Sequence, residues 1–229
     1  MGVTVVHILF PLLTVTAVAL VQRRFGHRVG GVVVGLPLTM VPFLAALVVA
    51  RGPAAAADAA RGSMVGQVGV AVFCLVYAHL AHRRTRPPVA LAATLGAVAL
   101  TLAALSLLPP TWAAVPVALL GVGAALAALP AEPAAVPVRG TPWWDVPARA
   151  ATSVGIVVTV AGSADVLGTH LAGLLATAPV LLSVITPPTH HRDGHPAAEA
   201  LLHGTLRSVP ATTLFAATVA FGLPLVAPG

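Results

Sequence analysis

The sequence predicts an all-α, polytopic transmembrane helix bundle of about eight spans, and three observations support this fold class. The 229 residues are 58% hydrophobic and only 8% charged, whereas soluble domains carry about one-quarter charged residues. Apolar runs of about 18 residues or more, long enough to cross a bilayer, fill nearly the whole chain. The twelve basic residues are all arginine and lie in short clusters between these runs. This distribution excludes a soluble domain and a basic nucleic-acid-binding surface.

The predicted spans are bounded by clusters of Arg, His, Pro or Gly residues. In chain order they cover residues 3–21, 29–50, 63–81, 89–108, 112–129, 146–163, 167–185 and 205–226. The first run has no basic residue before it and is followed by Arg23 and Arg24. This order predicts a retained first span and not a cleaved signal peptide.

The arginines predict the orientation of the bundle. With eight spans, the odd-numbered loops carry ten arginines, and the other side carries only Arg51 and Arg61. Because arginine concentrates in cytoplasmic loops, the odd-numbered loops are expected in the cytoplasm and both termini outside. The expected location is a bacterial cell inner membrane.

The chain resembles itself at an offset of 142 residues. The coinciding positions are Gly26 with Gly168, Gly31 with Gly173, Pro37 with Pro179, Gly52 with Gly194, and Gly62 with Gly204. Such weak self-similarity is typical of duplicated membrane folds. It predicts a first copy at about 3–85, linking spans within 88–130, a cytoplasmic loop at 131–145 and a second copy at about 146–229. Five spans separate the starts of the three-helix copies, so the repeats are expected to have inverted topology.

The second helix of each copy carries small residues followed by a mid-span proline. The predicted substrate-binding residues are Gly31, Gly35 and Pro37 in the first copy and Gly173, Thr177 and Pro179 in the second. A proline leaves the carbonyl four residues earlier without its helical partner. At mid-membrane this carbonyl is a candidate ligand for an ion or a polar substrate. A kink that serves only helix packing is the alternative.

The spacing of these small residues and prolines also resembles a known family. A short first span and a basic turn precede Gly30, Gly31, Pro37 and Gly52, and the second copy has Ala172, Gly173, Pro179 and Gly194. This pattern resembles the four-span inner-membrane proteins called GlpM-like, over roughly the first hundred residues and the last eighty. The resemblance implies two such units fused in opposite orientations. The second copy departs from the family by ending after three spans, and the resemblance implies no activity.

Six ionisable residues near span ends are candidates for proton coupling or gating. Two pairs share a helix face near the start of the third helix of each copy, Asp58 with Arg61 and Glu199 with His203. Asp165 and His170 flank the short sixth loop. The alternatives are interfacial ion pairs that anchor a helix end, and polar caps of a turn.

The stretch HHRDGHPAAEALLHG, residues 190–204, holds a candidate metal site. Its potential ligands are His190, His191, Asp193, His195, Glu199 and His203. Zinc takes three or four ligands of these types. The first four are predicted in a loop, and the last two on one face of a helix that Pro196 starts. The spacing matches no known metal motif, so a hydrated cytoplasmic loop is the alternative.

These observations predict a transporter or permease for a small molecule or ion, coupled to protons and built from inverted repeats in a lipid bilayer. For such a transporter we predict no cofactor and no nucleic-acid partner. Its chains could also assemble into a homo-oligomer. The alternative is a membrane-embedded metalloenzyme that acts on a lipid or other apolar substrate at the cytoplasmic face, with a divalent metal such as zinc. An enzyme is the less favoured class, because no catalytic motif is present. A scaffold subunit of a larger membrane complex is a third option.

Overall fold

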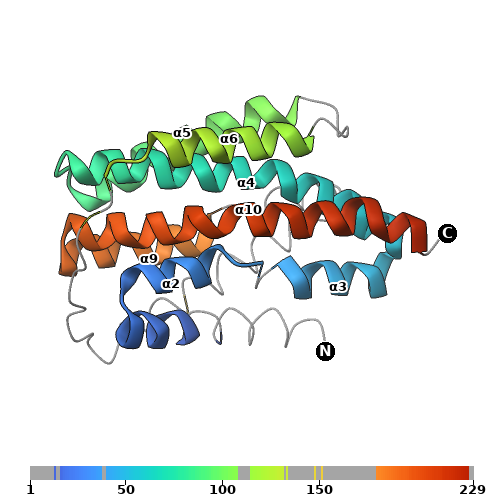
Figure 1. The fold of residues 1–229 in the computed structure, drawn as a ribbon, viewed down its shortest axis with the longest axis horizontal. Coiled ribbons are helices and arrows are strands. Elements are labelled where there is room, and N and C mark those ends of the chain that lie inside the picture. Colours follow the sequence, from blue (N-terminus) through green and yellow to red (C-terminus); the bar gives the residue numbers. More distant parts are fainter. Residues whose placement is uncertain are drawn as a thin grey trace.

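A computed structural model of the chain describes residues 16–37, 40–107, 114–131 and 179–226, with a few isolated positions besides. Every regular element in these ranges is a helix, which confirms the all-helical prediction for them. The labelled helices are α2 (His27–Gly35), α3 (Met40–Arg51), α4 (Pro53–His82), α5 (Pro87–Ser106), α6 (Ala114–Ala128), α9 (Val180–Asp193) and α10 (His195–Val226) (Figure 1). Residues 16–25 are also helical.

Three of the described helices are long and apolar enough to cross a membrane. They are Pro53–His82, Pro87–Ser106 and His195–Pro224, and the shorter Val115–Ala128 is also apolar. These segments support the prediction of transmembrane helices. The predicted span at 146–163 and most of those at 3–21 and 167–185 fall outside the described residues.

The two longest helices, α4 and α10, lie side by side in the centre of the bundle and run antiparallel (Figure 1). His82 at the end of α4 approaches Glu199 near the start of α10. Ala59 and Ala60 near the start of α4 pack with Ala216 in the second half of α10. Helices α5 and α6 pack against α4, whereas α2 and α9 pack against α10.

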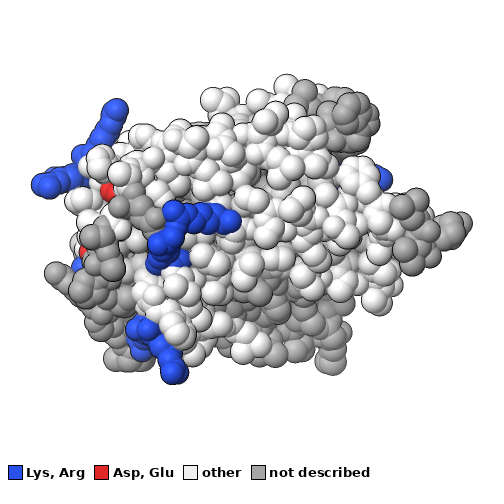
Figure 2. Space-filling view, in the orientation of Figure 1, with Lys and Arg blue, Asp and Glu red and all other residues white. Residues whose placement is uncertain are grey.

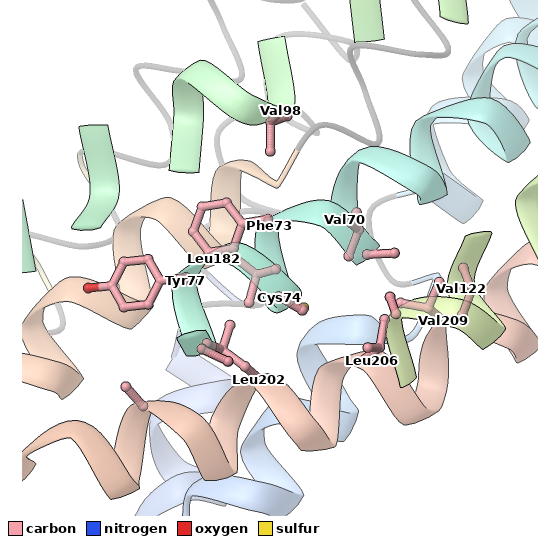
Figure 3. Packing of buried hydrophobic residues seen from close by; sticks show 14 of the residues in the cluster. Val70, Phe73, Cys74, Tyr77, Val98, Val122, Leu182, Leu202, Leu206 and Val209 are labelled. Carbon is pink, nitrogen blue, oxygen red and sulfur yellow. The ribbon is translucent and has the colours of Figure 1, made fainter. Parts of the chain in front are cut away.

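The largest apolar cluster joins these layers. Its buried side chains come from α4, α5, α6, α9 and α10, and Figure 3 labels Val70, Phe73, Cys74, Tyr77, Val98, Val122, Leu182, Leu202, Leu206 and Val209. The Phe73 and Tyr77 rings are stacked with centroids 5.7 Å apart. Since lipid tails are as apolar as these side chains, close packing is what holds such helices together in a bilayer.

Glycines allow α2 and α10 to approach each other closely. A Cβ atom at Gly31 would collide with the Leu201 carbonyl, and one at Gly204 would collide with the Arg28 carbonyl. Gly35 likewise faces the Thr205 carbonyl and the Ser208 hydroxyl. The Gly31–Gly35 pair therefore has the close-packing geometry expected of small residues four apart in membrane helices.

Single glycines connect three pairs of consecutive helices in the described ranges, the first being Gly26, with φ 90° and ψ 171°, between residues 16–25 and α2. Gly52 between α3 and α4 has φ 86° and ψ 173°, and Gly194 between α9 and α10 has φ 88° and ψ 174°. This combination is essentially restricted to glycine. Helices α4 and α10 begin at Pro53 and His195, ten residues before the predicted spans at 63 and 205, and follow α3 and α9 after one residue.

The predicted continuous span at 29–50 is also interrupted. Helix α2 ends at Gly35 and α3 begins at Met40. Leu36 is extended, with φ −69° and ψ 155°, because the ring of Pro37 disfavours the helical conformation in the preceding residue. The Leu36 N–H donates to the Val33 carbonyl at 3.3 Å and closes the last turn of α2.

Candidate functional site

Histidines and carboxylates from four helices meet at one end of the bundle. We call this the arginine-rich end, and it is where α2 and α10 begin and where α4 and α9 end. Arg23, Arg24, Arg28, Arg83, Arg84, Arg86 and Arg192 lie in or next to these helix ends. In Figure 2 most of the blue surface gathers at this end, at the left, and a small blue area marks the opposite end.

The first pair of this end joins α2 to α9. Nε2 of His27, the first residue of α2, lies 3.3 Å from Oδ2 of Asp193, the last residue of α9. Both side chains are only 2% exposed. A carboxylate so far from water requires a compensating partner, and the His27 imidazole lies in position to be one.

The second contact joins α4 to α10 through Glu199. Its Oε1 lies 3.3 Å from Nδ1 of His195 and 3.5 Å from Nδ1 of His82. The Glu199 side chain is 3% exposed, whereas those of His195 and His82 are 33% and 62% exposed. One buried carboxylate oxygen thus faces two imidazoles that reach solvent.

Two further contacts complete the polar cluster. The Tyr77 hydroxyl lies 3.3 Å from Nδ1 of His190, and the two rings meet edge to face. Burial lowers the pKa of His190, and the positive charges of His195 and His191 lower it further. Nε2 of His203 donates to the Pro130 carbonyl at 2.9 Å, which ties α10 to the segment that follows α6.

The prediction of a loop at residues 190–195 is wrong. His190, His191 and Asp193 lie in the last turn of α9, and His195 is the first residue of α10. The tandem prolines Pro187 and Pro188 made a helix here improbable, but α9 continues through them. Each proline costs one internal hydrogen bond, and the surrounding tertiary packing retains the helix. A hydrated loop is likewise wrong, since His190, Glu199 and His203 are buried. The helix predicted near Pro196 is confirmed.

The six potential metal ligands are not gathered at one point. Glu199 and His203 share a helix, but Glu199 contacts His82 and His195, whereas His203 bonds to a carbonyl. Within the described ranges, no group of three or more His, Cys, Asp and Glu side chains could hold a metal ion. Zinc binding stays a prediction without structural support.

The remaining gating candidates lie elsewhere. Asp58 and Arg61 are in the first third of α4, towards the opposite end of the bundle, and both are partly exposed. Asp165 and His170 fall outside the described residues. The structure therefore brings Glu199 and His203 to the arginine-rich end and Asp58 and Arg61 to the other.

A second polar region lies at the interruption between α2 and α3. The Thr212 hydroxyl of α10 donates to the Gly35 carbonyl at 2.6 Å, and the Ser208 hydroxyl donates to the Thr205 carbonyl at 2.8 Å. Thr205, Ser208 and Thr212 are all buried on α10. The end of α2, where helix carbonyls carry partial negative charge, thus faces a row of hydroxyl groups.

The predicted substrate-binding residues divide between packing and the interruption. Gly31 and Gly35 lie in the close contact with α10, and Pro37 follows the end of α2. Pro179 is buried and immediately precedes α9. Gly173 and Thr177 fall outside the described residues.

The sequence prediction missed His27, Tyr77 and His82 at the arginine-rich end, and Ser208 and Thr212 at the interruption. His82 precedes a run of arginines and looks solvated in the sequence, and its 62% exposure agrees. His27 also lies among arginines in the sequence, so its neighbours do not distinguish it from His82, although His27 is buried. The useful signal for Ser208 and Thr212 was their spacing of four on an apolar helix.

Comparison with known proteins gives no match, whether against protein-family models, curated proteins or solved structures. The resemblance to GlpM-like proteins stays a prediction.

Proposed function

We propose that this protein is a membrane transporter for a small molecule or ion that works by alternating access between two inverted three-helix copies. The observation that carries the proposal is the interrupted helix α2–α3, whose break faces buried hydroxyl groups of α10. Interrupted helices are tolerated at membrane depth where they are buried in protein or line a cavity. In secondary transporters they form the substrate and ion sites.

The helix boundaries support the duplication. Shifted by the 142-residue offset, α3 would cover 182–193 and α4 would cover 195–224. Helices α9 and α10 cover Val180–Asp193 and His195–Val226, so the corresponding boundaries agree within two residues. The connecting glycines Gly52 and Gly194 have the same backbone conformation. Two copies of one helix–glycine–helix unit account for this agreement.

The antiparallel arrangement supports inversion of the copies. Gly52 connects α3 and α4 at one end of the bundle, and Gly194 connects α9 and α10 at the other (Figure 1). The corresponding prolines are also placed alike, since Pro37 precedes α3 and Pro179 precedes α9. Rocking of two such units exposes a central site to each side in turn.

Proton coupling is part of the proposal. Asp193 and Glu199 are ionisable groups at the ends of helices in a mostly apolar chain, and each faces a histidine. Ionisable residues in membrane helices mark proton or substrate pathways, and histidine titrates in the physiological range. The coupling is tested by repeating the experiment below with a pH gradient across the membrane.

The test is access to the break from both sides of the membrane. A Ser208→Cys substitution in a Cys74→Ser background places one thiol on the α10 face that meets Gly35. Right-side-out and inside-out vesicles are treated with a charged, membrane-impermeant thiol reagent. Labelling from both sides is expected, because alternating access opens the break to each side in turn.

Native Cys74 is the control for general loosening, because its side chain is fully buried in the core. In the otherwise unmodified chain it should stay unlabelled from either side. A Ser208→Cys thiol that reacts from neither side, at any pH gradient, would show a permanently closed helix crossing and contradict transport through this region.

A further inference from the structure

The polar contacts at the arginine-rich end connect one copy to the other. His27 and His82 belong to the first copy, whereas Asp193 and Glu199 belong to the second. Sequence spacing had suggested pairs within each copy, Asp58 with Arg61 and Glu199 with His203. Two of the described pairs instead join α2 to α9 and α4 to α10, whereas His195 and Glu199 pair within α10. In both pairs between helices, the carboxylate comes from the second copy and the histidine from the first.

Both pairs sit next to the points where the chain turns. His27 follows Gly26, which has φ 90°, and Asp193 precedes Gly194, which has φ 88°. His82 is the last residue of α4. A Cβ atom at Gly26 would meet no heavy atom within 4 Å, so its positive φ, not crowding, explains the glycine. Contacts at such positions can separate when a helix pivots about the glycine, without disturbing the helix interiors.

Apolar side chains pack together at the opposite end. There α3, α4 and α10 meet through apolar side chains, among them Met40, Leu44, Met64 and Ala220. Apolar surfaces slide and repack at small cost in a bilayer, because lipid is an equally apolar environment. A buried carboxylate that loses its partner must instead reach water or another donor. Opening at the arginine-rich end therefore has to give the buried Asp193 and Glu199 carboxylates water or a new donor.

We propose that His27–Asp193 and His82–Glu199 form the gate at the arginine-rich end, and that this structure holds it closed. The inference rests on the proposed function, since a gate requires a site that opens. Separation of the copies at this end breaks both pairs together and admits water to the carboxylates. The same movement gives the break beside Gly35 access to that side of the membrane. His195 remains with Glu199 on α10 throughout, because both belong to one helix.

The titratable groups around the gate have identified contacts. His190 of α9 faces Tyr77 of α4, and His203 of α10 faces the Pro130 carbonyl. His191 and Arg192 follow on α9, and Arg28 and Arg83 neighbour the two gate histidines in sequence. Arg28 and Arg83 follow the two gate histidines in the sequence and Arg192 precedes Asp193, so neutralising Asp193 or Glu199 also weakens any attraction between these arginines and the carboxylates.

The experiment measures labelling of the Ser208→Cys reporter in the Cys74→Ser background with the same impermeant reagent. Asp193→Asn and Glu199→Gln keep side-chain size and remove the charge. Each should raise the labelling rate from the arginine-rich side about tenfold or more, as expected when a closed state loses a differential contact. Labelling from the opposite side should stay equal or fall. His82→Gln, whose parent side chain is mostly exposed, should change the rate in the same direction while leaving the fold intact.

Asp58→Asn is the matched control, because Asp58 lies towards the opposite end on α4. It should leave labelling from the arginine-rich side unchanged. The gate proposal is overturned if the labelling rate is unchanged in Asp193→Asn, Glu199→Gln and His82→Gln. This requires that each variant has the same size-exclusion profile and melting temperature as the parent. An equal increase in Asp58→Asn would overturn it too, since any lost charge would then suffice.

Failure of the gate and failure of transport give different results. If Ser208→Cys reacts from both sides in the parent but the gate variants match it, only the gate is wrong. If Ser208→Cys reacts from neither side in the parent or any gate variant, the proposed function is wrong. A thermal double-mutant cycle on His27→Gln and Asp193→Asn is independent of transport. Melting shifts that add without coupling would contradict the pair itself.

Discussion

At the scale of single residues, the buried pair of Tyr77 and His190 shows how tertiary packing changes a side chain's chemistry. The pKa of His190 is lowered by burial and by His195 and His191. The folded protein therefore favours neutral His190, whereas the unfolded chain protonates it near the ordinary value of about 6.5. Between the lowered pKa and about 6.5 the unfolded state binds more protons. Stability contributed by His190 is thus present above that window and lost as pH falls through it.

Replacing His190 should flatten the pH dependence of melting. The parent in detergent should lose thermal stability as pH falls from about 8 to about 5, and His190→Gln should lose less over this range. His79→Gln is the control, since Nδ1 of His79 lies 2.9 Å from the Leu75 carbonyl of its own helix at an exposed position. A parent and a His190→Gln variant with identical slopes would contradict the prediction.

Sequence spacing identified Glu199 and His203 as residues of interest but could not identify their partners. An i,i+4 spacing states only that two side chains share a helix face. The partner of Glu199 on the other copy, His82, is over one hundred residues away in the sequence, and the pairing depends on how α4 meets α10. The contact of His27 with Asp193 likewise depends on how α2 and α9 are placed.

At the scale of helices, the one-residue connections are the least tolerant positions. Gly52 and Gly194 have φ near +90° and extended ψ, a conformation that costs a residue with a side chain about 1–3 kcal/mol. Gly52→Ala and Gly194→Ala should each lower the free energy of unfolding by this amount, measured by thermal or chemical denaturation in detergent. The crowding at Gly194 is ordinary, so backbone strain is the cause at both positions.

Gly96→Ala in α5 is the matched control. Gly96 has no positive φ, and a Cβ atom there would meet nothing within 4 Å. Alanine is the better helix former by about 0.5–1 kcal/mol, so this substitution should stabilise the protein. If all three substitutions change stability alike, the special conformation of Gly52 and Gly194 has no energetic consequence.

Helix type was predictable from the sequence, whereas helix ends were not. Long apolar runs leave no alternative to helices in a bilayer, so α4, α5 and α10 were expected. The predicted spans at 63 and 205 begin later than α4 and α10 because spans were bounded by clusters of Arg, His, Pro or Gly, and each helix continues through such residues. Asp58 and Glu199 both lie within these helices, where the buried Glu199 carboxylate contacts His82 and His195. The interruption after Gly35 was foreseen only as a kink or freed carbonyl at Pro37.

At the scale of the whole molecule, the distribution of arginine predicts orientation. In a Cys74→Ser background, Arg83→Cys should react with an impermeant thiol reagent only from the cytoplasmic side, and Arg51→Cys only from outside. Both parent side chains are exposed, so access depends only on the side of the membrane. Right-side-out and inside-out vesicles distinguish the two. Reaction of both thiols from one side would contradict the placement of residues 51 and 83 on opposite sides of the membrane.

Architecture at this scale was partly predictable. An offset of 142 residues placed Gly52 on Gly194, and their common conformation agrees with that alignment. Which helices pack together was not readable, because alanine-, leucine- and valine-rich helices offer many equivalent apolar faces. The contact of α2 with α10 depends on Gly31, Gly35 and Gly204, which have no side chains and lie at facing positions along the two helices. Such matching involves distant parts of the chain and leaves no local pattern.

The interruption after Gly35 also constrains the order of biosynthesis. Helix α2 has nine residues and rises only about 14 Å, less than half of a hydrocarbon core of about 30 Å. Thr212, which donates to the Gly35 carbonyl, is 177 residues further along the chain. During translation the Gly35 carbonyl can therefore gain this donor only after α10 has been synthesised. A nascent chain stopped before α10 lacks this contact, so the interruption is completed only by a segment made much later in translation.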